Sequence, residues 1–398
     1  GRAGRHCVST GGSMCRSVWR RGGLAILVLF LSLGGAFTAG LDGVARAAPT
    51  PGMLLSWGYD YSGQLGDGLE VNPESNPVPT AVLPASSGAS GYVAIVAADE
   101  FSVALKSDGT VYTWGLNDTG QSGNTPPATT TVRKPAVVPG VSGVIAISAE
   151  SKHVLALKSD GTVMAWGSDA QGILGDGTVG SPTNTSTPQA VTGLSDIVAI
   201  SAGPRHSLAV KSDGTVLGWG SDSNGELGDG TAGSPNANPT PQVVPGLSGV
   251  TAVVAGLGFS LALKSDGTVW AWGALTTETT PTPQAVSGMS GITAIDSGFG
   301  YAMALKSDGT LLALGSDAAG VFGDGTAGSP SDSPTPVAVP GVSGIVAFSA
   351  GNRHVLALKS DGSVLGWGSD QTGQLGDGTV GSPSLNPTPT AVPGLSGV

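Results

Sequence analysis

Three histidines lie in stretches that are almost copies of one another, and histidine is a common metal ligand and general base near neutral pH. The stretches are HVLALKSDGTVMAWGSD from His153, HSLAVKSDGTVLGWGSD from His206 and HVLALKSDGSVLGWGSD from His354. In the other copies the same position is taken by Phe101, Phe259 and Tyr301. A phenyl ring can neither ligate a metal nor accept a proton, so the pattern predicts a packing role for this position.

Two further motifs invite a chemical interpretation. A hydrolase triad built on the repeated Ser-Asp pair would need a nucleophile on a strained turn, but no GxSxG motif occurs after residue 47. The pair lies in KSDG, and Asp-Gly is typical of a tight hairpin turn. The LGDGT stretches, such as Leu174–Thr178, carry one Asp between glycines rather than the alternating ligands of a calcium loop. We expect turns here, and no catalytic residue, cofactor or metal site, although metal binding by the LGDGT stretches stays open.

The spacing of these motifs indicates the architecture. KSDG begins at Lys106, Lys158, Lys211, Lys264, Lys306 and Lys359. A Trp-Gly follows each of them except at Leu314, and an additional one begins at Trp57. The intervals along this series are 57, 52, 53, 53, 42 and 53 residues, and the short one reflects a deletion after Gly273. Periods near fifty residues favour the blades of a β-propeller.

The expected fold is an all-β propeller with about four antiparallel strands per blade. Stretches such as Ile197–Ala202 are apolar at nearly every position, which is typical of strands buried on both faces. Six complete hairpins and a lone strand, Met53–Gly58, predict six complete blades and an incomplete seventh. By comparison with 145–161, 17 residues of that blade are lacking, so we expect a chain truncated at its C-terminus.

The stretch AGPRHSLAVKSDGTVLGWGSDSNGELGDGT (Ala202–Thr231) resembles the regulator of chromosome condensation repeat, and the likeness extends from Met53 to Val398. The resemblance implies a seven-bladed propeller. It also implies, as alternatives, a protein-binding scaffold of the secreted bacterial type or nucleotide exchange on the small GTPase Ran. Binding of cell-wall carbohydrate is a third alternative, but aromatic residues make up only 5 % of the chain.

Residues 1–47 are expected to be an N-terminal extension with a secretory signal peptide, and 48–398 the propeller. Arg20 and Arg21 precede the apolar run LAILVLFLSLGGAF, and the small residues of Ala45–Ala47 suit cleavage near Ala47. The alternative is a membrane anchor, although the run is short for a bilayer span. Cleavage would remove both cysteines and change the net charge from −11 to −16, which argues against nucleic-acid binding. We therefore expect a secreted or cell-surface protein without a stable membrane span, a monomer.

Function in a propeller resides in loops, so the loop positions at which the repeats differ are the candidate site. The varying pair before the His or aromatic position is expected to form a rim that binds a protein partner. Its residues are Asp99, Glu100, Lys152, Arg205, Leu257, Phe299, Asn352 and Arg353. The deletion after Trp272 is expected to leave a notch on the opposite or outer side, as a second candidate. The leading interpretation is an exported, non-enzymatic binding scaffold.

Overall fold

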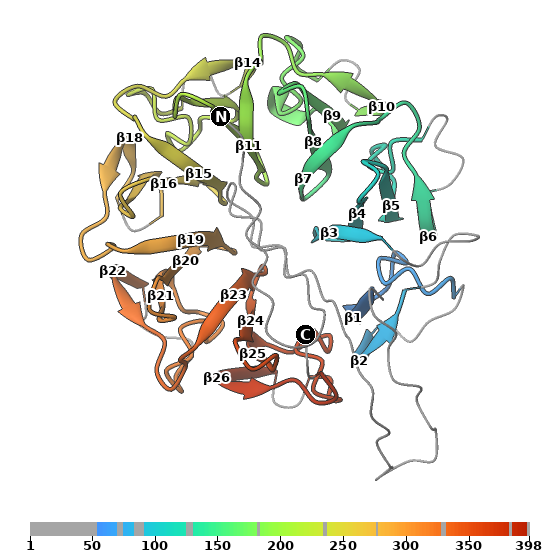
Figure 1. The fold of residues 1–398 in the computed structure, drawn as a ribbon, viewed down its shortest axis with the longest axis vertical. Helices are drawn as coiled ribbons and strands as arrows, with labels where there is room; N and C mark the ends of the chain where they lie inside the picture. The colour runs from blue at the N-terminus through green and yellow to red at the C-terminus, as the bar shows by residue number, and fades with distance from the viewer. Residues whose placement is uncertain are drawn as a thin grey trace, which may run out of the picture.

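The computed structural model describes residues 54–69, 75–82, 91–124, 130–180, 184–233, 237–275, 278–327, 332–381 and 384–395. In these ranges the strands form six four-stranded antiparallel sheets and one two-stranded sheet. The sheets are arranged as blades around a central axis, with the first strand of each complete blade nearest the centre (Figure 1). The predicted all-β propeller with six complete blades is confirmed. The proposed signal peptide, 1–47, lies outside the described residues.

Each complete blade is a meander in which consecutive strands pair. Blade 1 comprises β3 (Tyr92–Ala97), β4 (Phe101–Lys106), β5 (Val111–Leu116) and β6 (Thr131–Val137). Blade 2 comprises β7 (Val144–Glu150), β8 (His153–Lys158), β9 (Val163–Ser168) and β10 (Asn184–Ala190), with the short 3-10 helix η1 (Ala170–Gly172) before β10. Blade 3 comprises β11 (Ile197–Ala202), β12 (His206–Lys211), β13 (Val216–Gly220) and β14 (Asn238–Val243).

The second half of the ring repeats this order. Blade 4 comprises β15 (Val250–Ala255), β16 (Phe259–Lys264), β17 (Val269–Gly273) and β18 (Thr280–Ala285). Blade 5 comprises β19 (Ile292–Ser297), β20 (Tyr301–Lys306), β21 (Leu311–Ser316) and β22 (Asp332–Ala338). Blade 6 comprises β23 (Ile345–Ala350), β24 (His354–Lys359), β25 (Val364–Ser369) and β26 (Leu385–Ala391).

The seventh position holds a half-blade, β1 (Leu55–Tyr59) paired with β2 (Ser75–Ala81). Trp57 places β1 at the level of the third strand of a complete blade. The sequence indicated β1 alone, and the structure adds β2, whose Pro77 accepts a hydrogen bond from Gly378 of blade 6 through its main-chain oxygen. The half-blade therefore occupies the place of the third and fourth strands between blade 6 and blade 1 (Figure 1).

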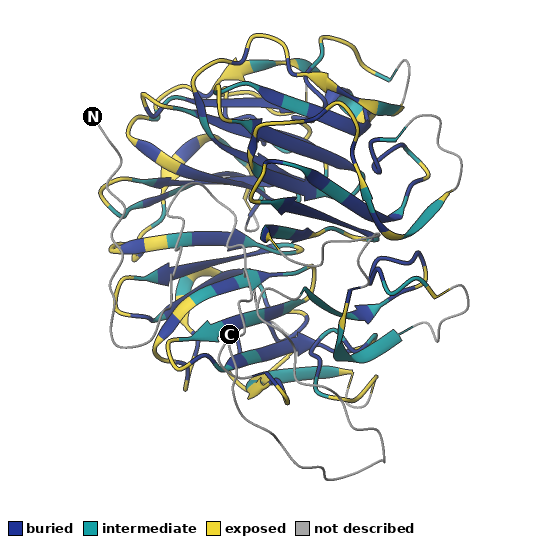
Figure 2. Ribbon diagram, turned by 45° about the vertical axis from the view of Figure 1, so that its right-hand side comes forward, coloured by how far each residue is buried: buried dark blue, intermediate teal, exposed yellow. Residues whose placement is uncertain are grey.

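The hairpin between the second and third strands forms as the sequence predicts. In blade 2, Gly161 has a φ of 80° and donates its N–H to the oxygen of Lys158, while Asp160 Oδ1 accepts the N–H of Thr162. A residue with a side chain would be strained at this φ, which explains the recurrent glycine. The second strands of blades 1 to 5 are buried at their first five positions, which matches their continuous apolar sequence, whereas β24 is buried only at alternate positions. Figure 2 shows that buried residues predominate in the strands and exposed residues in the loops.

A tryptophan fastens each of six sheets to the blade before it. Its indole Nε1 donates to a main-chain oxygen in the preceding sheet's loop between the third and fourth strands, at 2.7–3.0 Å. The pairs are Trp57–Gln374, Trp114–Gln64, Trp166–Gln121, Trp219–Ile173, Trp272–Glu226 and Trp367–Val321. The indole thus combines a large apolar contact with one satisfied polar group.

Blade 5 departs from this arrangement together with the blade before it. Leu314 takes the place of the tryptophan, and blade 4 has only the short segment 274–279 between β17 and β18. Blade 4 therefore has no long loop to supply the acceptor oxygen, and blade 5 has no indole at position 314 to supply the donor.

None of the described residues belongs to a helix that is both long and apolar enough to cross a membrane.

Candidate functional site: a loop cluster on one face of the propeller

The order of the strands determines which loops lie at each face of the propeller. In an antiparallel meander the loops after the first and third strands emerge at the same end, and those after the second strand at the other end. The candidate rim residues all lie in the loops between the first and second strands, so they share one face. The KSDG turns follow the second strands and share the opposite face.

The shortened segment 274–279 joins the third strand of blade 4 to the fourth. It therefore opens on the rim face, at the outer part of the blade. A notch at this segment, on the opposite or outer side, stays a prediction.

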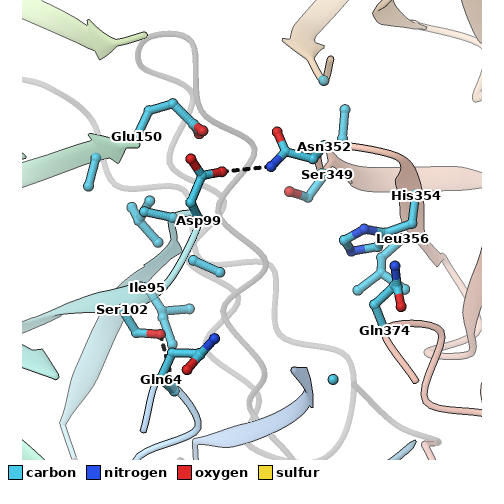
Figure 3. Close-up of a pocket in the computed structure, with 18 of the residues that line it drawn as sticks. Gln64, Ile95, Asp99, Ser102, Glu150, Ser349, Asn352, His354, Leu356 and Gln374 are labelled. Carbon is cyan, nitrogen blue, oxygen red and sulfur yellow. Dashed lines mark hydrogen bonds between the residues drawn. The ribbon is translucent and has the colours of Figure 1, made fainter. Parts of the chain in front are cut away.

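Four of the eight rim residues form one cluster, which we call the rim cluster: Asp99, Phe299, Asn352 and Arg353. Asn352 Nδ2 donates to Asp99 Oδ1 at 2.6 Å and so links blade 6 to blade 1 past the half-blade (Figure 3). The main-chain N–H of Phe299 in blade 5 donates to the oxygen of Asn352 at 2.9 Å. The guanidinium carbon of Arg353 lies 5.8 Å from the centre of the Phe299 ring, within the range of a cation–π contact. Three blades thus contribute to one exposed cluster.

The cluster has the composition of a protein-binding surface. The Phe299 side chain remains 53 % exposed although phenylalanine usually lies in the core, and Arg353, Asn352 and Asp99 around it are exposed as well. Aromatic and arginine side chains contribute most of the free energy in many protein interfaces.

The other four rim residues lie outside this cluster. Glu100 Oε2 accepts a hydrogen bond from Ser62 Oγ at 2.9 Å, and Lys152 forms an ion pair with Asp118 at 2.6 Å. Arg205 is exposed and Leu257 is half-buried.

The histidines that opened the sequence analysis join neighbouring blades. His153 Nε2 lies 3.0 Å from Ser207 Oγ, and His206 Nε2 lies 2.8 Å from Ser260 Oγ. The serine hydroxyls donate to the main-chain oxygens of Ile173 and Glu226, so in each pair the histidine is the donor to the serine. Burial lowers the pKa of His153 and of His206 to about 3, so both rings are neutral. Sequence reasoning missed these pairs.

The acidic residues of the LGDGT stretches stabilise their own loops. In blade 2, Asp176 Oδ1 accepts the N–H and the hydroxyl of Thr178, and Asp169 Oδ1 accepts the N–H of Leu174. This loop is joined to the next blade by a main-chain hydrogen bond, in which the N–H of Gly177 donates to the oxygen of Pro239. These contacts are turn chemistry, as the sequence favoured.

A cavity of about 650 Å³ opens beside the rim cluster. Its lining includes residues of all six complete blades, such as Glu150 of blade 2, Val254 of blade 4 and Asp296 of blade 5, so it extends along the central axis as well as between blade 6 and blade 1. Asp99 and Asn352 lie at its edge, and its lining includes His354, Leu356 and Ile95. The part of the cavity next to β1 lies between blade 6 and blade 1.

The strand order and the loop positions together define a β-propeller with its rim loops gathered at one face. The RCC1-like domain model matches residues 43–279, and the regulator of chromosome condensation (RCC1) repeat matches 345–374 and 361–398. The chain belongs to the family of RCC1-like propeller proteins.

The chain is similar in sequence to several proteins of different kinds. The E3 ubiquitin-protein ligase HERC2 of Homo sapiens is 27 % identical over 356 residues, 85 % of this chain and 7 % of HERC2. Protein pim1 of Schizosaccharomyces pombe is 32 % identical over 228 residues, 53 % of this chain and 42 % of pim1. The ultraviolet-B receptor UVR8 of Arabidopsis thaliana is 28 % identical over 344 residues, 82 % of this chain and 75 % of UVR8. The chain thus spans only a small part of HERC2 and less than half of pim1.

Two solved structures share the fold. The crystal structure of Prp20p from Saccharomyces cerevisiae has a TM-score of 0.72 at 22 % identity, and the match covers 85 % of this chain and 87 % of Prp20p. The crystal structure of human WBSCR16 has a TM-score of 0.72 at 21 % identity, and the match covers 85 % of this chain and 94 % of WBSCR16.

Proposed function

We propose that this chain is an exported, non-enzymatic binding scaffold that engages a protein partner through the rim cluster. The observation that carries the proposal is the exposed Phe299 with Arg353 beside it, held on loops of rigid blades. A pre-organised surface of this kind binds a partner with little loss of conformational freedom.

What is described for relatives supports a protein as the partner. Prp20p is described with its binding to Gsp1p and histones, and the same yeast protein is described bound to Kap60. Among the described residues, the contacts of the rim cluster give no specific support to nucleotide exchange or carbohydrate binding.

Export rests on the sequence of residues 1–47, in which basic residues, an apolar run and small residues follow one another.

The test is a pull-down from culture medium with three forms of the mature propeller as bait. The first is the wild type, and the second changes Phe299, Asn352 and Arg353 to Ala. The third changes Lys158, Lys211 and Lys306 to Ala, which alters as many side chains on the opposite face. A partner retained by the first and third baits and lost from the second supports the proposal. A partner retained equally by the first two contradicts it.

A further inference from the structure

The loop between the third and fourth strands of blade 5 contains two aspartates, Asp317 and Asp324. Blades 2, 3 and 6 have the same arrangement, with the pairs Asp169 and Asp176, Asp222 and Asp229, and Asp370 and Asp377. In all four loops Oδ1 of the first aspartate accepts the main-chain N–H of the residue five positions further on, at 2.8–3.2 Å. The other oxygen of this aspartate, Oδ2, is left to contact the rest of the loop.

In three of these loops a threonine hydroxyl lies between the two carboxylates. Its oxygen is 3.1–3.4 Å from Oδ2 of the first aspartate and 2.7–2.8 Å from Oδ1 of the second. The threonines are Thr178, Thr231 and Thr379. Because one hydroxyl contacts both carboxylates, the two aspartates of each loop lie side by side, and Oδ2 of the first points toward the second.

The blade 5 loop lacks one of these contacts. The Thr326 hydroxyl donates to Asp324 Oδ1 at 2.6 Å, as its counterparts do. Asp317 Oδ2, however, has no hydrogen-bond partner among the described residues, although Asp317 is only 1 % exposed. A buried carboxylate oxygen without a partner is costly in free energy. The oxygens that meet in the other loops are therefore present in blade 5, but one of them is unsatisfied.

No positive charge compensates this pair of carboxylates. None of the ion pairs formed by the described residues includes Asp317 or Asp324. The sequence of the loop, 316–327, contains no Lys, Arg or His. Like charges that lie side by side repel each other, most strongly where one of them is withdrawn from water. A cation between the two carboxylates would remove this repulsion and give Asp317 Oδ2 a partner.

The backbone of the loop is fixed by blade 6. The main-chain N–H of Gly325 donates to the oxygen of Pro387 at 3.0 Å, and the indole of Trp367 donates to the oxygen of Val321 at 2.8 Å. Both partners belong to the last two strands of blade 6. The fold therefore positions the two carboxylates in advance, and a site formed in advance loses little conformational freedom when it binds its ligand.

We propose that the blade 5 loop 317–326 binds a hard divalent cation through Asp317 Oδ2, a carboxylate oxygen of Asp324 and the hydroxyl oxygen of Thr326. Calcium fits best, because it accepts about six to eight oxygen ligands in a flexible arrangement. Water completes the shell, since Asp324 and Thr326 are exposed. The inference is independent of the proposed function, because this loop lies outside the rim cluster.

The number of carboxylates sets the expected affinity. Among the described residues, no three side chains of His, Cys, Asp or Glu gather in a way that could hold a metal ion. The blade 5 site thus has two charged ligands, and one of them is exposed. We expect a dissociation constant of about 10⁻⁴–10⁻³ M, the range of extracellular calcium-binding modules.

Calorimetric titration of the full chain with calcium chloride, after a chelator has removed bound metals, tests the proposal. We expect one ion to bind per chain. Asp317→Asn should weaken binding about tenfold or more, because it removes a charged ligand. The amide oxygen of the variant can still accept the N–H of Phe322, and thermal unfolding checks that the variant remains folded. Absence of saturable binding at about tenfold above the expected concentration range overturns the proposal.

Matched variants distinguish blade 5 from the other loops. Asp324→Asn alters an exposed residue and should also weaken calcium binding, so it serves as the second variant if Asp317→Asn does not fold. Asp222→Asn and Asp229→Asn in blade 3 should leave the affinity unchanged, because the Thr231 hydroxyl already lies between these two carboxylates. Equal weakening by the blade 3 and blade 5 variants overturns the proposal.

Terbium luminescence shows where the ion binds. Terbium ions take the same oxygen ligands as calcium and emit when a nearby tryptophan transfers its excitation energy to them. Trp367 contacts this loop at Val321, so the wild type should give a sensitised emission that excess calcium abolishes. The emission should persist in Asp222→Asn and be lost in Asp317→Asn. Emission of equal strength in both variants overturns the proposal.

Discussion

His206 Nε2 lies 2.8 Å from Ser260 Oγ, although the two side chains belong to neighbouring blades and lie 54 residues apart in sequence. Both are buried, and the Ser260 hydroxyl donates a hydrogen bond to the main-chain oxygen of Glu226. The pair therefore connects two blades through a chain of hydrogen bonds in a part of the core where an unpaired polar group is costly.

A double-mutant cycle should reveal this coupling. Ser260→Ala alone should lower the free energy of unfolding by about 1–3 kcal/mol, because it leaves the buried imidazole N–H without an acceptor. The double variant His206→Phe with Ser260→Ala reproduces the native pair Phe259 and Ala302 and should lose less than the sum of the single changes. Urea unfolding measures the cycle, with Ser212→Ala in an exposed turn as the control. Strict additivity would contradict the assigned contact.

The buried histidines should make the protein sensitive to acid. Burial lowers the pKa of His153 and His206 to about 3, below the value of about 6.5 in an unfolded chain. Below about pH 6.5 the imidazoles of the unfolded state take up protons that those of the folded state do not, so the free energy of unfolding falls until the pH reaches about 3. Relative to pH 7, each histidine should cost about 2 kcal/mol at pH 5. The double variant at 206 and 260 should lose one such contribution, and an unchanged pH profile would contradict the lowered pKa.

The short segment 274–279 of blade 4 and Leu314 of blade 5 should be replaceable by the loop and the tryptophan of other blades only when both are changed together. Leu314→Trp alone should destabilise the protein by about 1–3 kcal/mol, because a larger side chain enters a packed region that offers no acceptor loop. Replacing 274–280 with the blade 3 segment 221–238, together with Leu314→Trp, should be more stable than either change alone. Thermal unfolding of the three variants gives the comparison. A Leu314→Trp variant as stable as the combined one would show that the two changes are unrelated.

The N-terminal sequence should be removed on export. Protein recovered from the medium should begin near Ala48, as determined by N-terminal sequencing or intact mass. Changing Ala45 and Ala47 to Arg should block cleavage, because the peptidase prefers small residues at these positions. A secreted protein that retains residues 1–47 would contradict the signal-peptide assignment.

The fold could be predicted because its sequence signals recur within each blade. The contacts between blades could not be predicted in the same way. Asp-Gly turns, apolar strands and the Trp-Gly spacing each act within one blade, so six blades followed from local sequence. The partners of His153 and His206 lie one repeat further along the chain, so the histidines could be assigned to packing but not to hydrogen bonds. The rim positions were predictable as loops. The bond from Asn352 to Asp99 was not, because it joins residues 253 apart that meet only when the blades form a ring.

The central claim is that the rim cluster contacts a protein partner. Its most direct test places a photocrosslinking amino acid at position 299, and in a matched protein at position 212 on the opposite face, before irradiation in culture medium. We predict a crosslinked polypeptide from position 299 that is absent from position 212 and lost when Asn352 and Arg353 are also changed to Ala. Equal crosslinking from both positions, or from position 212 alone, would contradict the account.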